Sequence, residues 1–517
     1  MEPHSLNQAA KDLVKVEAVN IYQTLSYSQN LSVYRGLSLR MRQAIFDVID
    51  ALGDELGLQV VSNGASTGVF SCKEQEHACT RIKAYLETYY QGFTFTVTGI
   101  SAVHYSNYRD ALERLIQQGR EAQLGQTAIS VLETSETSNI CQLSHILPAD
   151  TTVNVQGQQD VAVNPFIKSA FEFGKEQKQQ FYNNELNIIG ATCRITKFAE
   201  NFEQIALKTK YKMLEGKLAY VYFDGNKFSR IQNIVAQSVE AQIEFDKFLQ
   251  TKRAQLLEKI LEWVAKDADF NEHKALGGAR FETLLWGGDE CFFVMPASKG
   301  FEFIAKVNEW TQNWKFKDYP LTHAFGLVFC HMKNLIQKIR ALAYELAESV
   351  KDNLVNNAPI PTDEGSRKHI KGLGNGFQYM VLESIDTPEQ CLAEHYKICY
   401  GHLAPERARH FSQSVASEEI KKLASNLEKL GKSQAYQTAK VAISALQDKD
   451  KLSKQLERMQ LVSELSSDGF THIYDTAGLL LLGAKLSDSE DHTLKGLLWV
   501  LITESWEYLV LSDREVA

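Results

Sequence analysis

One order of predicted strands and helices occurs twice along the chain, and this repetition constrains the fold more than any other feature. The central copy has a strand at 217–224, a helical region at 227–266, a hairpin with its turn at 287–290, a helix at 300–314, a strand at 321–330 and a helix at 334–351. The N-terminal copy has a strand at 15–22, a helix at 36–56, a hairpin at 58–72, a helix at 74–90, a strand at 93–103 and a helix at 108–124. Each copy is βαββαβ followed by a helix, which is the ferredoxin-like order. We therefore expect an α+β protein with two ferredoxin-like domains.

The chain of 517 residues is long enough for several domains, and four segments are expected. Residues 1–125 form the first copy, and residues 126–213 form a polar linking region of irregular structure that ends in a helix at 197–217. Residues 214–386 form the second copy with an added strand at 377–385. Residues 387–517 show amphipathic periodicity and predict a helical domain.

Charge, cysteine content and hydropathy exclude several classes of protein. The formal net charge of -9 argues against autonomous binding to DNA, because such binding usually needs a strongly basic face. The eight cysteines form no C-x-x-C pair and predict reduced cytosolic thiols. The longest apolar run is too short to span a bilayer, so we expect a cytoplasmic protein without a membrane partner.

The two copies differ at the positions where chemistry would take place. Asp224 ends the first strand of the second copy, and Asp289 and Glu290 lie in its Gly-Gly-Asp-Glu hairpin turn; the first copy has no acid at either place. The strand end and the adjacent turn meet at one edge of a ferredoxin-like sheet, so the carboxylates should lie together. An oxygen-rich site of this kind suits Mg²⁺ or Mn²⁺. The acids are not needed to make the hairpin, because the first copy forms its turn without them.

Such a site can perform two-metal nucleotidyl transfer. One ion lowers the pKa of an attacking hydroxyl, and the other stabilises the α-phosphate and the leaving pyrophosphate. Gly287 and Gly288 leave room for a nucleotide to approach the backbone. The turn after Asp224 can present backbone N–H groups to a triphosphate, and its candidate residues are Gly225, Asn226 and Phe228. An ordinary exposed turn remains the alternative for Gly-Gly-Asp-Glu taken alone.

The segments "YVYFDGNKFSRIQ" and "LLWGGDECFFVMP" resemble the palm of the GGDEF and polymerase/cyclase superfamily. A doubled palm with an acid-free first copy and a helical C-terminal domain is similar to the large subunit of type III CRISPR effector complexes, or to a stand-alone relative of it. The resemblance implies that Asp224, Asp289 and Glu290 are catalytic metal ligands. It also implies that Lys351 contacts the polyphosphate. Glu290 stands where the family usually has Asp.

The resemblance implies a metal-dependent enzyme of antiviral defence that converts ATP into a cyclic oligoadenylate messenger. Guide RNA and other CRISPR effector subunits would be its partners. Two alternatives stay open at this point. One is a diguanylate-cyclase-like enzyme, and the other is an inactive RNA-guided scaffold subunit that binds nucleotide without turnover.

Overall fold

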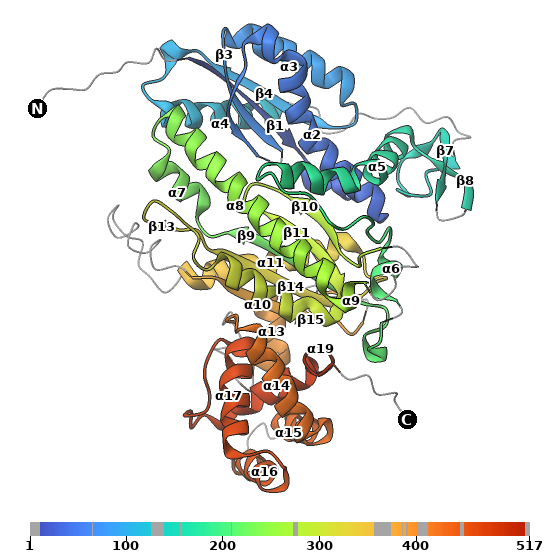
Figure 1. Ribbon diagram of the computed structural model, residues 1–517, viewed down its shortest axis with the longest axis vertical. Helices are drawn as coiled ribbons and strands as arrows, with labels where there is room; N and C mark the ends of the chain where they lie inside the picture. The colour runs from blue at the N-terminus through green and yellow to red at the C-terminus, as the bar shows by residue number, and fades with distance from the viewer. Residues whose placement is uncertain are drawn as a thin grey trace, which may run out of the picture. The chain divides into compact units, whose positions relative to one another are not determined.

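The structure is a computed structural model that describes residues 11–64, 66–125, 139–155, 158–207, 209–271, 278–355, 374–384, 386–388, 391–401, 403, 412–444 and 449–511. Its residues divide into two compact units. The first contains Met1–Cys193, Lys227–Glu258 and Leu284–Gly288, and the second contains Arg194–Asn226, Lys259–Thr283 and Asp289–Ala517. Figure 1 labels their helices and strands. The four-segment division by sequence stays a prediction.

The first copy forms a four-stranded antiparallel sheet in the order β2-β3-β1-β4. Its elements are β1 (Asp12–Val19), α2 (Leu31–Leu56), β2 (Gln59–Asn63), β3 (Thr67–Cys72), α3 (Gln75–Tyr89), β4 (Thr94–Ile100) and α4 (Tyr108–Gly125). Buried side chains of α2 and α3 pack on one face of the sheet, and those of α4 pack on the other. The βαββαβ order is confirmed here. The predicted strand at 15–22 ends early, because Asn20 is left-handed and the short helix α1 (Ile21–Leu25) follows it.

The second copy repeats this strand order with one strand added. Its sheet has the order β10-β11-β9-β14-β15, in which β14 and β15 pair in parallel and β9 lies antiparallel to β11 and β14. The strands are β9 (Lys217–Gly225), β10 (Glu282–Trp286), β11 (Cys291–Pro296), β14 (His323–His331) and β15 (Gly376–Val381). The helical region predicted at 227–266 is two helices, α7 (Phe228–Val235) and α8 (Val239–Lys266). The α+β class and the repeated architecture are therefore confirmed.

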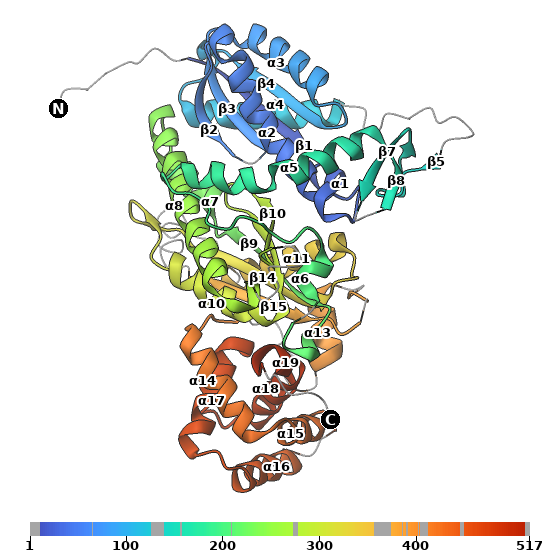
Figure 2. The ribbon, with the colours of Figure 1, turned by 45° about the vertical axis from the view of Figure 1, so that its right-hand side comes forward.

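Two helices cover opposite faces of the second sheet. In α10 (Gly300–Thr311), Phe303 packs on Phe293 of β11 with ring centroids 5.4 Å apart. On the other face, α11 (Ile336–Val355) approaches β14 so closely that a Cβ on Gly326 would lie 1.9 Å from the carbonyl oxygen of Ala343. Glycine at position 326 thus fixes how near α11 lies to the strands. Figure 2 shows α10 and α11 beside this sheet.

The region at 126–213 has more regular structure than the sequence predicted. It holds the hairpin of β7 (Thr151–Val155) and β8 (Gln158–Val163) and the helix α5 (Pro165–Asn187), which begins with an Asn164 cap and a proline. The helix predicted at 197–217 was wrong, since among the described residues of this range only α6 (Phe202–Ala206) and a 3₁₀ turn at Lys212–Leu214 are helical. Long-range pairing explains the difference. The Ala199 N–H donates to the Ala279 carbonyl at 2.8 Å, and this contact holds the chain extended.

The C-terminal segment is helical, as predicted. Its helices are α13 (Leu392–Tyr400), α14 (Ser417–Leu430), α15 (Lys432–Ser444), α16 (Lys449–Val462), α17 (Ser467–Leu482), α18 (His492–Glu504) and α19 (Trp506–Leu509), drawn in orange and red in Figure 1. Trp499 is fully buried among them and donates its indole N–H to Tyr474. Within the described part of the chain, no helix combines the length and the apolar content that crossing a bilayer requires.

Candidate functional site

Asp224 lies at the end of β9, one residue before the strand finishes. The preceding residues of β9 are largely buried, because the strand is central and covered on both faces. Alternation along the strand places Asp224 on the same face as Tyr222, whose ring packs edge-on against Tyr344 of α11 with centroids 5.5 Å apart. The Asp224 carboxylate is therefore held at the rim of the sheet on the α11 side.

Asp289 lies in the turn that joins β10 to β11, and the structure brings it close to Asp224. Burial raises the pKa of the Asp289 carboxyl above its usual range, and the negative charge of Asp224 raises it further. A negative charge close to a carboxyl disfavours its ionisation, so the charge of Asp224 acts against the ionised form of Asp289. The predicted meeting of the strand end and the hairpin turn is thus present, although the sequence separation between them is 65 residues (289 − 224).

Lys351 of α11 supplies the nearest positive charge. Its ammonium Nζ donates to Asp224 Oδ2 at 2.5 Å and to Glu348 Oε1 at 2.7 Å. The side chains of Lys351 and Asp224 are 17% and 19% exposed, so the pair is screened only partly by solvent. Burial lowers the pKa of the Lys351 ammonium, but the carboxylates of Asp224 and Glu348 outweigh it, and the net shift is upward. Lys351 is therefore charged and lies beside Asp224, and its contact with a polyphosphate stays a prediction.

Glu290 makes a different set of contacts from the other two acids. Arg340 of α11 donates a hydrogen bond to Glu290 Oε1 at 3.4 Å, and the hydroxyl of Tyr222 also hydrogen-bonds the Glu290 carboxylate. Burial is the first cause that raises the pKa of Tyr222, and the charges of Glu290 and Asp224 add to it. The carboxylate of Glu290 thus extends to α11.

One face of α11 supplies most of the residues around the acids. Arg340, Tyr344, Glu348 and Lys351 are spaced by four, four and three positions, which places them on one side of a helix. Tyr344 is 48% exposed; partial burial raises the pKa of its phenol, and the nearby charge of Glu348 raises it further while that of Lys351 opposes the rise. Sequence reasoning named only Lys351. The signal that could have found the others is this polar and aromatic stripe on a helix whose opposite face is apolar.

The residues expected to bind nucleotide through the backbone lie beside the acids in the chain. The N–H of Gly225 donates to Asp224 Oδ1 at 2.8 Å, and the N–H of Asn226 donates to the Thr322 carbonyl at 2.8 Å. The Asn226 amide also donates to Thr322 Oγ1 at 3.0 Å. The backbone N–H groups of Gly225 and Asn226 are thus already bonded within the protein. Phe228 is the first residue of α7, and the side chain of the N-cap residue Lys227 makes no capping hydrogen bond. Their role in binding nucleotide stays a prediction.

The two glycines of the turn precede Asp289 directly. Gly287 is buried, and a Cβ built on Gly288 would meet no heavy atom within 4 Å. The space beside Gly288 is therefore open rather than filled by protein. This is the arrangement expected if a nucleotide approaches the backbone there.

His323 and His331 are the first and last residues of β14, and their contacts are structural. Burial lowers the pKa of His323 to about 3, so its imidazole is neutral, and its ring packs edge-on against Phe223 at 5.4 Å. His331 accepts a hydrogen bond from the Lys333 N–H at 3.2 Å in the turn after β14. The interpretation of both as structural histidines agrees with these contacts.

The residues present fit a hard cation, with two protein carboxylates as its ligands. Among the described residues, no group of three or more His, Cys, Asp or Glu side chains is arranged to hold a metal ion. Asp224 and Asp289 nevertheless form an oxygen-only pair, in which burial raises the pKa of Asp289 and the negative charge of Asp224 raises it further. Mg²⁺ commonly takes one or two carboxylates and completes its shell with water and phosphate oxygens.

Comparison with known proteins adds evidence on the fold. No family model matches the sequence, and no curated protein matches it. A crystal structure of the Csm1-Csm4 cassette in complex with cA4 matches with a TM-score of 0.51 at 12% identity, over 96% of this chain and 70% of that chain. Csm1 of T. onnurineus matches with a TM-score of 0.51 at 13% identity, over 95% and 70%. The apo Csm1-Csm4 cassette matches with a TM-score of 0.50 at 14% identity, over 96% and 70%.

These similarities extend over nearly the whole chain, so they include both palms and the helical segment rather than a single ferredoxin-like domain. Identities of 12% to 14% carry information on the fold alone. The predicted resemblance to the double-palm large subunit of type III CRISPR complexes is confirmed at that level, and this chain has the fold of Csm1.

Proposed function

We propose that the second palm is a metal-dependent nucleotidyl transferase that joins ATP molecules into a cyclic oligoadenylate. The observation that carries the proposal is the placement of Asp224 at the end of β9 and of Asp289 in the turn before β11, the strand paired with β9, with the charged Lys351 bonded to Asp224. Neighbours of the same fold are described in complex with cA4 and with cA3, which supports adenine nucleotides as ligands. Partner subunits are proposed on the same basis, because these neighbours are Csm1-Csm4 cassettes.

In this proposal Asp224 and Asp289 hold divalent cations. Such ions would supply the positive charge that the phosphates of two ATP molecules require when they lie together. Lys351 moves from Asp224 to a phosphate oxygen of the bound nucleotide, and Gly288 lets the nucleotide approach the turn. The hydroxyl of one ATP attacks the α-phosphorus of another, so that one O–P bond forms while the bond to pyrophosphate breaks.

Glu290 takes a supporting role in the same proposal. Its contacts with Arg340 and Tyr222 tie the hairpin turn to α11 and β9, which fixes the position of Asp289. A metal-ligand role for Glu290, as the resemblance implies, would require it to leave Arg340. The two roles are separated by variants described in the Discussion.

The test is incubation of the purified protein with each of the four NTPs and with Mg²⁺ or Mn²⁺, followed by chromatography and mass analysis of the products. The proposal predicts oligoadenylates from ATP, with or without a cognate guide-RNA complex. Turnover of GTP alone to a cyclic dinucleotide would favour the diguanylate-cyclase alternative. No product from any NTP, even with the complex present, would favour the scaffold alternative.

A further inference from the structure

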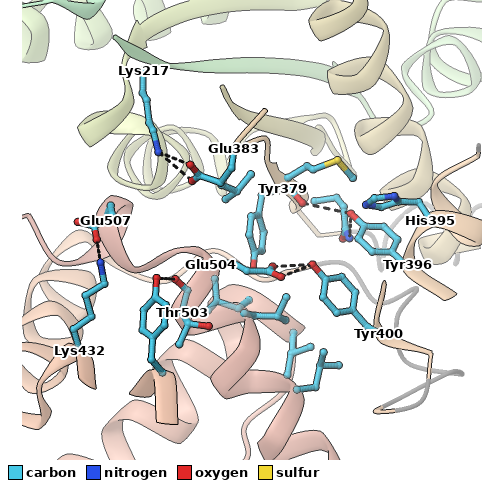
Figure 3. A pocket seen from close by; sticks show the side chains of 18 of the residues that line it. Lys217, Tyr379, Glu383, His395, Tyr396, Tyr400, Lys432, Thr503, Glu504 and Glu507 are labelled. Carbon is cyan, nitrogen blue, oxygen red and sulfur yellow. Dashed lines mark hydrogen bonds and ion pairs between the residues drawn. The ribbon is translucent and has the colours of Figure 1, made fainter. Parts of the chain in front are cut away.

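A cavity of about 570 Å³ lies within the second unit, between β15 and the C-terminal helices α13, α15, α17 and α18 (Figure 3). This volume is within the range of small-molecule sites, roughly 300–1,000 Å³. Neither Asp224 nor Asp289 lines it, so it is separate from the carboxylates described above. The cavity is formed by side chains from segments far apart in the sequence.

Aromatic and apolar side chains form most of its walls. The aromatic residues are four tyrosines, and Tyr396 stacks on Tyr400 with ring centroids 6.2 Å apart. The others are Tyr379 of β15 and Tyr436 of α15. Leucines of α17 and α18 complete the surface: Leu481, Leu482, Leu497 and Leu501. Walls of this composition suit a flat or apolar molecular body.

One carboxylate of the cavity, that of Glu504, has no ion pair with a lysine or arginine of the described residues. Lys217 donates to Glu383 Oε2 at 2.8 Å, and Lys432 pairs with Glu507, so each lysine is neutralised by a glutamate. Glu504 is the remaining acid, and no Lys or Arg of the described residues forms an ion pair with it. Since both lysines are paired, the described residues that line the cavity carry an excess of negative charge at Glu504.

Glu504 is one of the residues that line the cavity. The Tyr400 hydroxyl hydrogen-bonds both of its carboxylate oxygens, at 2.9 and 2.7 Å, as Figure 3 shows. Its side chain has exposed surface because the cavity is open to water, yet enough protein surrounds it that burial raises the pKa of its carboxyl. Burial also lowers the pKa of His395 in the same wall, so this imidazole is neutral and does not offset the charge.

We propose that this cavity binds a small organic cation, with its charged nitrogen on Glu504 and its flat or apolar body against the tyrosines. Tyrosine faces attract cations in addition to the carboxylate. An anion such as a nucleotide would add negative charge beside Glu504 and would compete with Glu383 and Glu507 for the two lysines. The proposal does not depend on the nucleotide chemistry proposed for the second palm.

The test uses three probes of nearly equal shape and different charge: benzamidinium, benzamide and benzoate. Isothermal titration of the full chain should show saturable binding of benzamidinium, about 10-fold or more tighter than benzamide, since a hydrogen bond between two charged groups is stronger than one from a neutral amide. Benzoate should not bind. Glu504→Gln should abolish the preference for the cation, whereas Glu394→Gln, an exposed change on α13 outside the cavity, should keep it.

Equal or tighter binding of benzamide or benzoate would overturn the proposal, and so would absence of benzamidinium binding. A preference that persists in a folded Glu504→Gln protein would also overturn it. If that variant does not fold, crystals of the unaltered protein with 4-bromobenzamidinium decide the question. The anomalous bromine signal should lie in the cavity, with the amidinium at Glu504; a signal elsewhere contradicts the proposal.

Discussion

The ammonium of Lys351 lies 2.5 Å from Asp224 Oδ2, so the lysine forms an ion pair with the carboxylate that the proposed cation would bind. This ion pair neutralises Asp224 when no ligand is present. A divalent cation must compete with the lysine, and a nucleotide phosphate gives the displaced ammonium a new partner. Cation binding and nucleotide binding are therefore expected to strengthen each other through Lys351.

Replacing Lys351 by methionine should have opposite effects on two measurements. Mg²⁺ binding in the absence of nucleotide should tighten several-fold, because the competing ammonium is gone. ATP turnover should fall by about 10- to 100-fold, because a charged contact to phosphate is lost. Titration calorimetry and product chromatography measure the two effects. Lys338→Met, an exposed change on the same helix, is the matched control, and weaker Mg²⁺ binding in Lys351→Met would contradict the competition.

Asp289→Asn should stabilise the fold at neutral and higher pH. Because folding raises the pKa of Asp289, its ionised form costs the folded state free energy. That cost is absent below the ordinary Asp pKa, where both states are protonated, and it grows as the pH rises through the raised pKa. Calorimetry should show the variant about 1–2 kcal/mol more stable at pH 8, and equal to the unaltered protein near pH 3. A less stable variant at pH 8 would exclude the repulsion.

Variants of Glu290 and of its partner Arg340 can show whether Glu290 fixes the hairpin turn or binds the metal ion. If Glu290 acts by fixing the turn, Arg340→Gln and Glu290→Gln should lower the melting temperature and turnover by similar modest amounts, about 1 kcal/mol in stability for a part-exposed pair. Mn²⁺ affinity should change little in either. If Glu290 is instead a ligand, Glu290→Gln alone should weaken Mn²⁺ binding at least 10-fold.

Two glycine substitutions test whether the missing side chain makes space for a ligand or allows a helix to pack closely. Gly288→Ala should leave the melting temperature nearly unchanged, because its Cβ would meet no atom within 4 Å, while KM for ATP should rise. Gly326→Ala should destabilise the protein by about 3 kcal/mol or more, because its Cβ would overlap a carbonyl of α11. Thermal unfolding compares both proteins. Unchanged ATP kinetics in Gly288→Ala would show that Gly288 does not lie against the bound nucleotide.

The sequence was sufficient for the palms because their strands alternate or are continuously apolar and their helices have a strong 3.6-residue period. The acids could also be placed, since ferredoxin-like order brings the end of β9 to the turn before β11. The helix α5 was missed although Asn164 and Pro165 form an ordinary helix start. The polar composition of this region predicted irregular structure, whereas the capping signal of Asn164 and Pro165 favours a helix.

Other features depend on contacts that one sequence does not display. The extended segment before α6 pairs with Ala279, so long-range hydrogen bonds override its helical pattern. The pairing of Arg340 with Glu290 joins positions 50 residues apart. The cavity around Glu504 is formed by strands and helices far apart in the sequence, and no local sequence pattern predicts that they meet.

The central claim is that Asp224 and Asp289 together hold a divalent cation. Mn²⁺ binding, followed by electron paramagnetic resonance during titration of the full chain, tests it without requiring turnover. The account predicts saturable binding that is weakened at least about 10-fold by Asp224→Asn and by Asp289→Asn, because each removes a charged ligand. Asp468→Asn, an exposed change on α17, should bind as the unaltered protein does. Equal Mn²⁺ affinity in all four proteins would contradict the account.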